Sequence, residues 1–136
     1  MTSFKSWTSG GGGSSLFELK GGIISSKQSK PMDIRNYIRA DRFYTRSDIR
    51  LKSNIEDLTD DDLDKLKKVV PKSYKFKNDN EKHFGFIAQD VEKQFPHLVS
   101  TDTEGMKSVN YLEIIPLLLH KINDLERKLE EIKNNK

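Results

Sequence analysis

The sequence predicts an α+β fold completed by self-association, with short β-strands, small helices and a C-terminal coiled coil. Apolar residues occur in short pieces broken by Gly and Pro, and a heptad pattern occupies the C-terminus. Only 34% of the 136 residues are hydrophobic, whereas 33% are charged. Because an isolated globular monomer usually has more apolar residues, we expect apolar surface to be buried between subunits. The simpler alternative is a partly disordered protein.

The first 46 residues predict a flexible head followed by a β-rich stalk. Residues 8–15 form a Gly/Ser tract with the composition of a flexible linker, so residues 1–15 read as head and linker. The head contains Phe4 and Trp7, which are favoured interface anchors, although a frayed terminus would look similar. Residues 16–46 contain short apolar pieces that predict strands, including Leu16–Leu19, Ile23, Ile24, Ile34, Tyr37, Ile38 and Arg42–Arg46.

Residues 54–71 predict a turn or short helix followed by one definite helix. Thr59 and Asp62 have the spacing of a capping box, and Pro71 ends the helix. The apolar stripe of this helix is expected at Leu63, Leu66 and Val70.

Residues 74–109 predict two small hairpins around a helix. Tyr74 and Phe76 alternate with lysines, and a turn at 78–80 leads to a returning strand at 83–87. A helix over 88–95 is ended by Pro96, and a second turn covers 101–105. We expect Gly85 to allow a close approach, and we expect a hydrophobic centre of Phe84, Phe86, Ile87, Val91, Phe95 and Leu98.

The C-terminus predicts a coiled coil over about residues 111–133. The expected seam, whose spacing alternates between three and four residues from Tyr111 onward, consists of Ile115, Leu118, Ile122, Leu125, Leu129 and Ile132. Lys121 at a g position can pair with Glu126 at an e position of a parallel partner. The alternative is one amphipathic helix packed on its own domain.

Charge and composition argue against several classes of binding site and targeting segment. The net charge is +3, and residues 1–46 carry 8 Lys or Arg against 3 Asp or Glu. Without an arginine-rich or aromatic-interleaved block, we do not expect nucleic-acid binding. The absence of cysteine excludes disulfides and thiolate metal sites. We expect no metal site, cofactor, signal peptide or membrane segment, and a soluble product made in the cytoplasm.

One pair of residues carries possible chemistry. A lysine amine can activate a serine hydroxyl as a nucleophile, and Ser47 and Lys52 lie five positions apart. That separation puts them on opposite faces of a strand and on different stripes of a helix. The two can therefore meet only through a bend or through a neighbouring subunit.

Three blocks resemble a known family. They are Ser47–Ile55, His83–Glu92 with Phe95–Val99, and Val109–Tyr111 running into the C-terminal helix. Together they resemble the intramolecular chaperone, or peptidase S74, domain of phage tailspikes and endosialidases, over residues 47–136. This resemblance implies an intertwined homotrimer with a triple-stranded coiled coil.

The resemblance also implies a function. It makes Ser47 the nucleophile that cuts the Arg46–Ser47 bond and Lys52 its general base, with Asp48 and Arg50 as supporting motif residues. We expect a self-cleaving trimerisation chaperone in a virion, whose head binds a capsid or fibre protein. An uncleaved trimeric virion protein and a plain coiled-coil interaction protein remain open alternatives.

Overall fold

The computed structural model describes residues 17–21, 23–26 and 32–136. The chain divides into two units, Met1–Leu51 and Lys52–Lys136, and each is described by itself. The predicted head with Phe4 and Trp7, the linker at 8–15, Leu16 and Pro31 lie outside the described residues.

The described part of the first unit contains one β-hairpin. Strands β1 (Phe17–Lys20) and β2 (Ile23–Ser26) are antiparallel, with Phe17 opposite Ser26 and Lys20 opposite Ile23. Gly21 follows β1 with a φ of 58°, a conformation that glycine adopts without steric cost.

The strands expected at Ile34–Ile38 and Arg42–Arg46 are absent from the structure, which corrects that prediction. Residues 32–48 contain only bends and irregular backbone, and all of their side chains are exposed. A strand needs a hydrogen-bonding neighbour and a packed face to be stable, and the described residues provide neither for this segment. The apolar pattern predicted strands, but it does not supply the neighbouring strand that such a segment needs.

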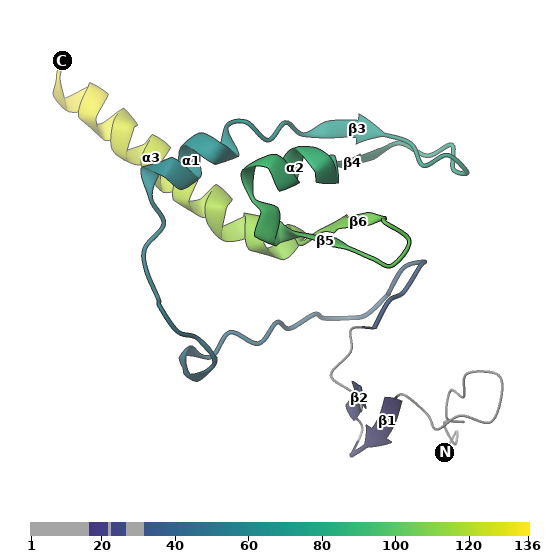
Figure 1. The fold of residues 1–136 in the computed structure, drawn as a ribbon. Helices are drawn as coiled ribbons and strands as arrows, with labels where there is room; N and C mark the ends of the chain where they lie inside the picture. The colour runs from purple at the N-terminus through teal and green to yellow at the C-terminus, as the bar shows by residue number, and fades with distance from the viewer. Residues whose placement is uncertain (1–16, 22, 27–31) are drawn as a thin grey trace, which may run out of the picture. The chain divides into compact units, whose positions relative to one another are not determined.

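The second unit has the predicted α+β composition (Figure 1). Its order is α1 (Asp60–Leu66), β3 (Lys72–Tyr74), β4 (His83–Gly85), α2 (Ala88–Gln94), the 3₁₀ helix η2 (Pro96–Leu98), β5 (Val99–Thr101), β6 (Lys107–Val109), the 3₁₀ helix η3 (Tyr111–Glu113) and α3 (Ile114–Asn134). Strands β3 and β4 form one antiparallel pair, and β5 and β6 form another.

Helix α1 begins at the predicted capping box. The Thr59 backbone N–H donates to Asp62 Oδ2 at 2.8 Å, and the Thr59 hydroxyl donates to the same oxygen at 3.0 Å. These bonds satisfy a donor at the helix start that would otherwise lack a partner. The helix is shorter than predicted, since it ends at Leu66 and Val70 is exposed. Val69, which is partly buried against the core, takes the place expected for Val70.

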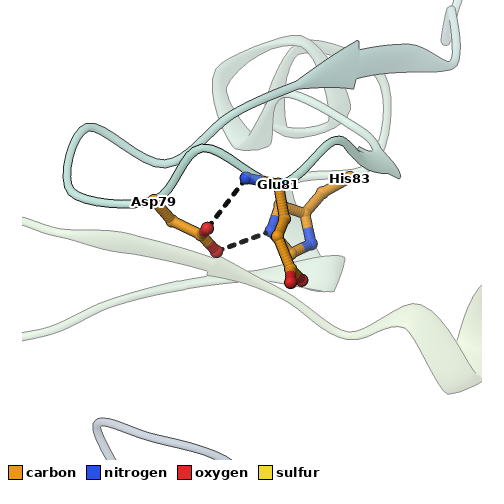
Figure 2. Close-up of side chains that lie close together, drawn as sticks. All are labelled: Asp79, Glu81 and His83. Carbon is orange, nitrogen blue, oxygen red and sulfur yellow. Dashed lines mark hydrogen bonds and ion pairs between the residues drawn. The ribbon is translucent and has the colours of Figure 1, made fainter.

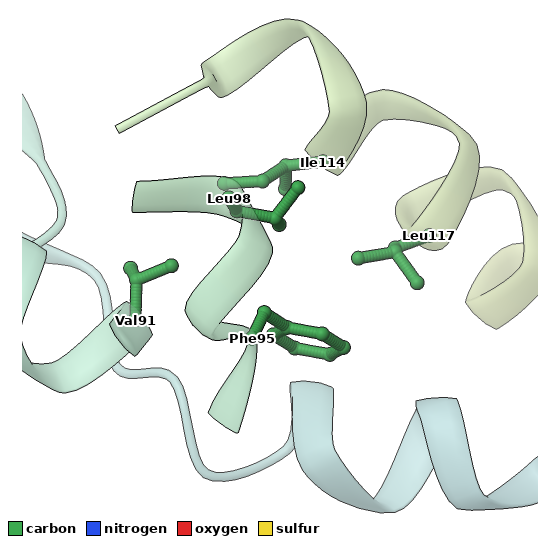
Figure 3. Packing of buried hydrophobic residues seen from close by; sticks show 5 residues of the cluster. All are labelled: Val91, Phe95, Leu98, Ile114 and Leu117. Carbon is green, nitrogen blue, oxygen red and sulfur yellow. The ribbon is translucent and has the colours of Figure 1, made fainter. Parts of the chain in front are cut away.

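The core of the second unit joins α2, η2 and the first turn of α3 (Figure 3). Its buried side chains are Val91, Phe95, Leu98, Ile114 and Leu117, with Leu66, Val69, Phe86, Val99 and Val109 packed against them. Burying a phenylalanine such as Phe95 contributes roughly 3–5 kcal/mol relative to alanine. The prediction was right for Val91, Phe95 and Leu98, and Phe86 lies at the edge of this core.

Phe84 and Ile87 were wrongly predicted to be core residues. Phe84 is 77% exposed, with the Lys82 ammonium 5.3 Å from its ring centroid, and Ile87 is 40% exposed. Successive side chains of a strand point to opposite faces. In β4, His83 and Gly85 face Tyr74 and Tyr111, so Phe84 points the other way.

Candidate functional site

The segment around Ser47 and Lys52 contains a bend, which is one of the two arrangements that the sequence left open. A 3₁₀ helix, η1 (Ile49–Leu51), lies between the two residues, and the Leu51 N–H donates to the Asp48 carbonyl at 3.0 Å. Ser47 precedes this turn and Lys52 follows it, and both are exposed. The Arg46–Ser47 bond itself lies in exposed irregular backbone, where water can reach it.

Asp48 and Arg50 are joined across η1 by three hydrogen bonds. The Arg50 backbone N–H and Nε each donate to Asp48 Oδ1 at 2.9 Å, and Nη2 donates to Oδ2 at 2.8 Å. The Arg50 guanidinium holds the pKa of the Asp48 carboxyl below its ordinary value, and the carboxylate raises the pKa of Arg50. Both members of the pair are therefore charged at neutral pH.

The motif region exposes much apolar surface. Ile49, Leu51 and Ile55 are between 63% and 71% exposed. Asn54 has a φ of 50°, in the left-handed region that asparagine enters more readily than most residues. Apolar side chains that alternate with ordered turns, but lie outside any core, are typical of a surface that another chain covers.

The second motif block is attached to the start of α3. The Phe86 N–H donates to the Tyr111 hydroxyl at 2.9 Å, and the two rings lie 5.6 Å apart between centroids. A Cβ on Gly85 would collide with that hydroxyl and would lie 3.3 Å from Tyr74 Cε1. The close approach expected at Gly85 is thus confirmed, with Tyr111 as the approaching group. Sequence reasoning had placed Tyr111 in the coiled coil, but it lies in η3 and contacts its own domain.

Helix α3 presents two different stripes. Ile114, Leu117 and Asp124 form the stripe that is buried in the chain's own domain. The neighbouring stripe is the predicted seam, and its members are between 47% and 60% exposed: Ile115, Leu118, Ile122, Leu125, Leu129 and Ile132. One stripe therefore packs on the chain's own domain, as the second alternative predicted, and the predicted seam is exposed in the single chain.

Asp124 is a buried carboxylate that sequence reasoning missed. It accepts hydrogen bonds from Lys128 Nζ at 2.7 Å and Arg127 Nη2 at 2.9 Å, and Lys121 Nζ lies 3.5 Å away. The Lys128 contact, followed by that of Arg127, lowers the pKa of Asp124 from 3.8 to about 2. Lys121, predicted to reach Glu126 of another chain, contacts Asp124 of its own helix. The i+3 and i+4 spacing of Arg127 and Lys128 was the available signal.

Asp79, Glu81 and His83 form a group that could hold a metal ion (Figure 2). One ligand atom from each residue lies within 4.8 Å of the others. The Asp79 carboxylate accepts the Glu81 N–H at 2.8 Å and contacts His83 Nε2 at 3.0 Å. These contacts account for the turn between β3 and β4 without an ion.

The described part of the chain contains no helix that is both long and apolar enough to cross a membrane.

Comparison with known proteins matches the same region. Residues 47–100 match the peptidase S74 family, described as the chaperone of endosialidase. The chain is also similar to the long tail fiber protein Gp37 of Enterobacteria phage M1 and to that of Enterobacteria phage Ox2. Each is 30% identical over 99 residues, which is 66% of this chain and 39% of the relative. The chain thus spans well under half the length of these relatives. The match of residues 47–100 to the chaperone-of-endosialidase family confirms the resemblance that the motifs predicted.

Proposed function

We propose that this chain is the trimerisation chaperone of a phage fibre and that it cuts itself once, between Arg46 and Ser47. Its family and the tail-fibre relatives support the chaperone role and a place in the virion. The observation that carries the assembly role is the seam stripe of α3, which is apolar along its whole length and uncovered in the single chain. A parallel coiled coil of three such helices would bury it.

The balance of apolar residues supports the same role. Among the described residues, six apolar side chains are buried, whereas 24 large apolar side chains are exposed. Exposed apolar patches of this extent mark interaction surfaces. The members from Ile34 to Ile55 precede the core in the chain, and neighbouring subunits of an intertwined trimer would cover them. Residues 1–15 as head, 16–46 as stalk and 47–136 as chaperone form the corresponding domain division.

In the proposed reaction, the neutral Lys52 amine takes the proton from Ser47 Oγ while Oγ attacks the Arg46 carbonyl carbon. The bond from that carbon to the Ser47 nitrogen breaks, and the nitrogen takes the proton back from Lys52. The product is an ester between the Arg46 acyl group and Ser47 Oγ. One water molecule hydrolyses this ester and leaves a carboxylate on Arg46 and a free amine on Ser47. Tethering of the reacting groups supplies the proximity that a second substrate would otherwise have to provide.

Intact mass combined with light scattering tests the proposal. The expected result is a trimer of chains that begin at Ser47, and a Ser47→Ala protein that forms a trimer at its full mass. A wild-type trimer that keeps its full mass would overturn the cleavage and would favour the uncleaved structural protein. A chain that stays monomeric at high concentration would overturn the assembly role. The binding partner of the head, a capsid or fibre protein, is part of the proposal and needs a separate pull-down with residues 1–46.

A further inference from the structure

We propose that Asp48 and Arg50 are positioning residues for the cut at Arg46–Ser47, a role that rests on the proposed function. The structural basis is the number of bonds that converge on one exposed carboxylate. Asp48 holds the Arg50 backbone, Nε and Nη2 at once, at 2.8–2.9 Å. An ordinary exposed ion pair contributes about 0–1 kcal/mol, but a bidentate arginine–carboxylate pair with a further backbone bond has a defined geometry.

The position of this pair in the chain gives it an effect on Ser47. Asp48 directly follows Ser47, and the Leu51 N–H closes the same turn by donating to the Asp48 carbonyl. The backbone on the C-terminal side of Ser47 is therefore fixed by four hydrogen bonds within residues 48–51. Attack by Ser47 Oγ on the preceding carbonyl needs a backbone that holds both groups in one geometry. The Asp48–Arg50 pair restricts the half of that backbone that follows the nucleophile.

The same pair has little to do with the stability of the folded core. Asp48 and Arg50 are exposed, and the buried core residues, from Leu63 onward, all lie in the second unit. Removing the pair should therefore slow cleavage and leave the melting temperature and the trimer almost unchanged. This separation between rate and stability is what distinguishes positioning from a structural role.

Four variants weaken the Asp48–Arg50 pair to different extents. Asp48→Asn keeps an oxygen for the Arg50 backbone N–H but loses the charge, and Asp48→Ala loses both. Arg50→Lys keeps the charge without the planar fork, and Arg50→Gln loses the charge. Asp64→Asn and Lys67→Gln are the matched controls for α1, because Asp64 in this helix forms another exposed ion pair, at 2.7 Å, with Lys67 at its C-terminal end.

The measurement is the rate at which the product beginning at Ser47 accumulates during refolding of the full chain, followed by intact mass. We expect the Ala and Gln variants to be slowed between about tenfold and about 100-fold, since small misplacements of reacting groups cost that much. Asp48→Asn and Arg50→Lys should lie between these and wild type, and the α1 controls should match wild type. An Asp48→Asn/Arg50→Gln double variant should be no slower than Arg50→Gln alone, because the two residues act as one unit.

Each other outcome overturns a specific statement. If wild type cleaves and all four variants cleave at its rate, the positioning role is wrong while the proposed function stands. If the variants lose the trimer together with cleavage, the pair is a stability element and the positioning role is again wrong. If the wild-type trimer never cleaves but the chain assembles, the proposed reaction fails first, and the positioning role fails with it.

Discussion

The Phe86 backbone N–H and the Tyr111 hydroxyl, 25 residues apart in sequence, are joined by a 2.9 Å hydrogen bond. This bond attaches the motif block that contains Gly85 to the residue that leads into α3. The contact places the start of the long helix against the hairpin of β3 and β4, so the orientation of the helix depends on the motif block. Gly85 is needed there because no side chain fits beneath the hydroxyl.

Tyr111→Phe should lower the free energy of unfolding by about 0.5–1.5 kcal/mol, because the ring stays but the Phe86 N–H loses its acceptor. Gly85→Ala should cost more, about 1–3 kcal/mol, because the added methyl displaces Tyr111. Urea unfolding followed by circular dichroism measures both. Equal stability of Gly85→Ala and wild type would show that Tyr111 does not occupy this position.

Phe95→Ala and Phe84→Ala should behave differently. Phe95 is 4% exposed, and its truncation should cost roughly 3–5 kcal/mol. Phe84→Ala should stay within about 0.5 kcal/mol of wild type, as surface substitutions usually do. A large loss for Phe84→Ala would instead mean that another subunit buries this ring.

Ile122→Asp/Leu125→Asp should dissociate the trimer. The substitutions would place six carboxylates in the seam of three helices, at a cost of several kcal/mol, on the order of that for burying unpaired charge. Asn123→Asp/Asn134→Asp adds the same number of carboxylates at exposed positions outside the seam and should assemble normally. Light scattering at several concentrations measures the oligomeric state of the seam variant and of the control. A seam variant that remained trimeric would refute this helix as the assembly element.

The Asp124 carboxylate should make the free energy of unfolding depend on pH in the acidic range. Its pKa in the folded chain, about 2, lies below the ordinary 3.8. A carboxyl whose pKa is depressed by folding stabilises the fold above its ordinary pKa, and that contribution is lost as pH falls through the folded value. Asp124→Asn should therefore lower the melting temperature at pH 7, and the difference from wild type should shrink between about pH 4 and about pH 2. A difference that stayed constant over this range would contradict the charge-based explanation.

Lys52→Ala and Lys52→Arg should both abolish cleavage at Arg46–Ser47 while the trimer forms. The first removes the base, and the second replaces it with a guanidinium that stays protonated. A contaminating trypsin-like protease would also cut after Arg46, so the Ser47→Ala protein is the control. Trypsin would still cut that protein, whereas self-processing needs the hydroxyl. Cleavage of both Lys52 variants at the wild-type rate would remove Lys52 from the reaction.

Local signals predicted the local elements of the second unit well. Thr59 and Asp62 marked a capping box, Pro96 ended α2, and the alternation around Tyr74 located a hairpin, because each depends on neighbours in sequence. The 3₁₀ turn between Ser47 and Lys52 is one of the two arrangements that the sequence left open, a bend or a neighbouring subunit. The dyad chemistry and the trimer stay predictions.

Long-range packing could not be predicted to the same extent. Phe84 and Phe86 are chemically identical and two residues apart, and one would expect them on the same face of a strand. Strand β4 ends at Gly85, however, so the alternation stops before Phe86, which turns toward Tyr111. The burial of Asp124 was not predicted, because aspartates are mostly exposed and the sequence does not show which face of the helix packs on the domain. The strands predicted between Ile34 and Arg46 did not form because nothing among the described residues pairs with this segment.

The two stripes of α3 have a consequence for how mutations in this helix are tolerated. The buried and the exposed stripe are offset by one residue, or about 100° of rotation. A single-residue insertion after Leu117 would leave Ile114 and Leu117 seated in the domain but turn every later seam residue toward a different side. The chain would then fold with its proposed contact surface facing another side. Deletions or insertions of seven residues would restore the phase, so length variation in this helix should come in whole heptads.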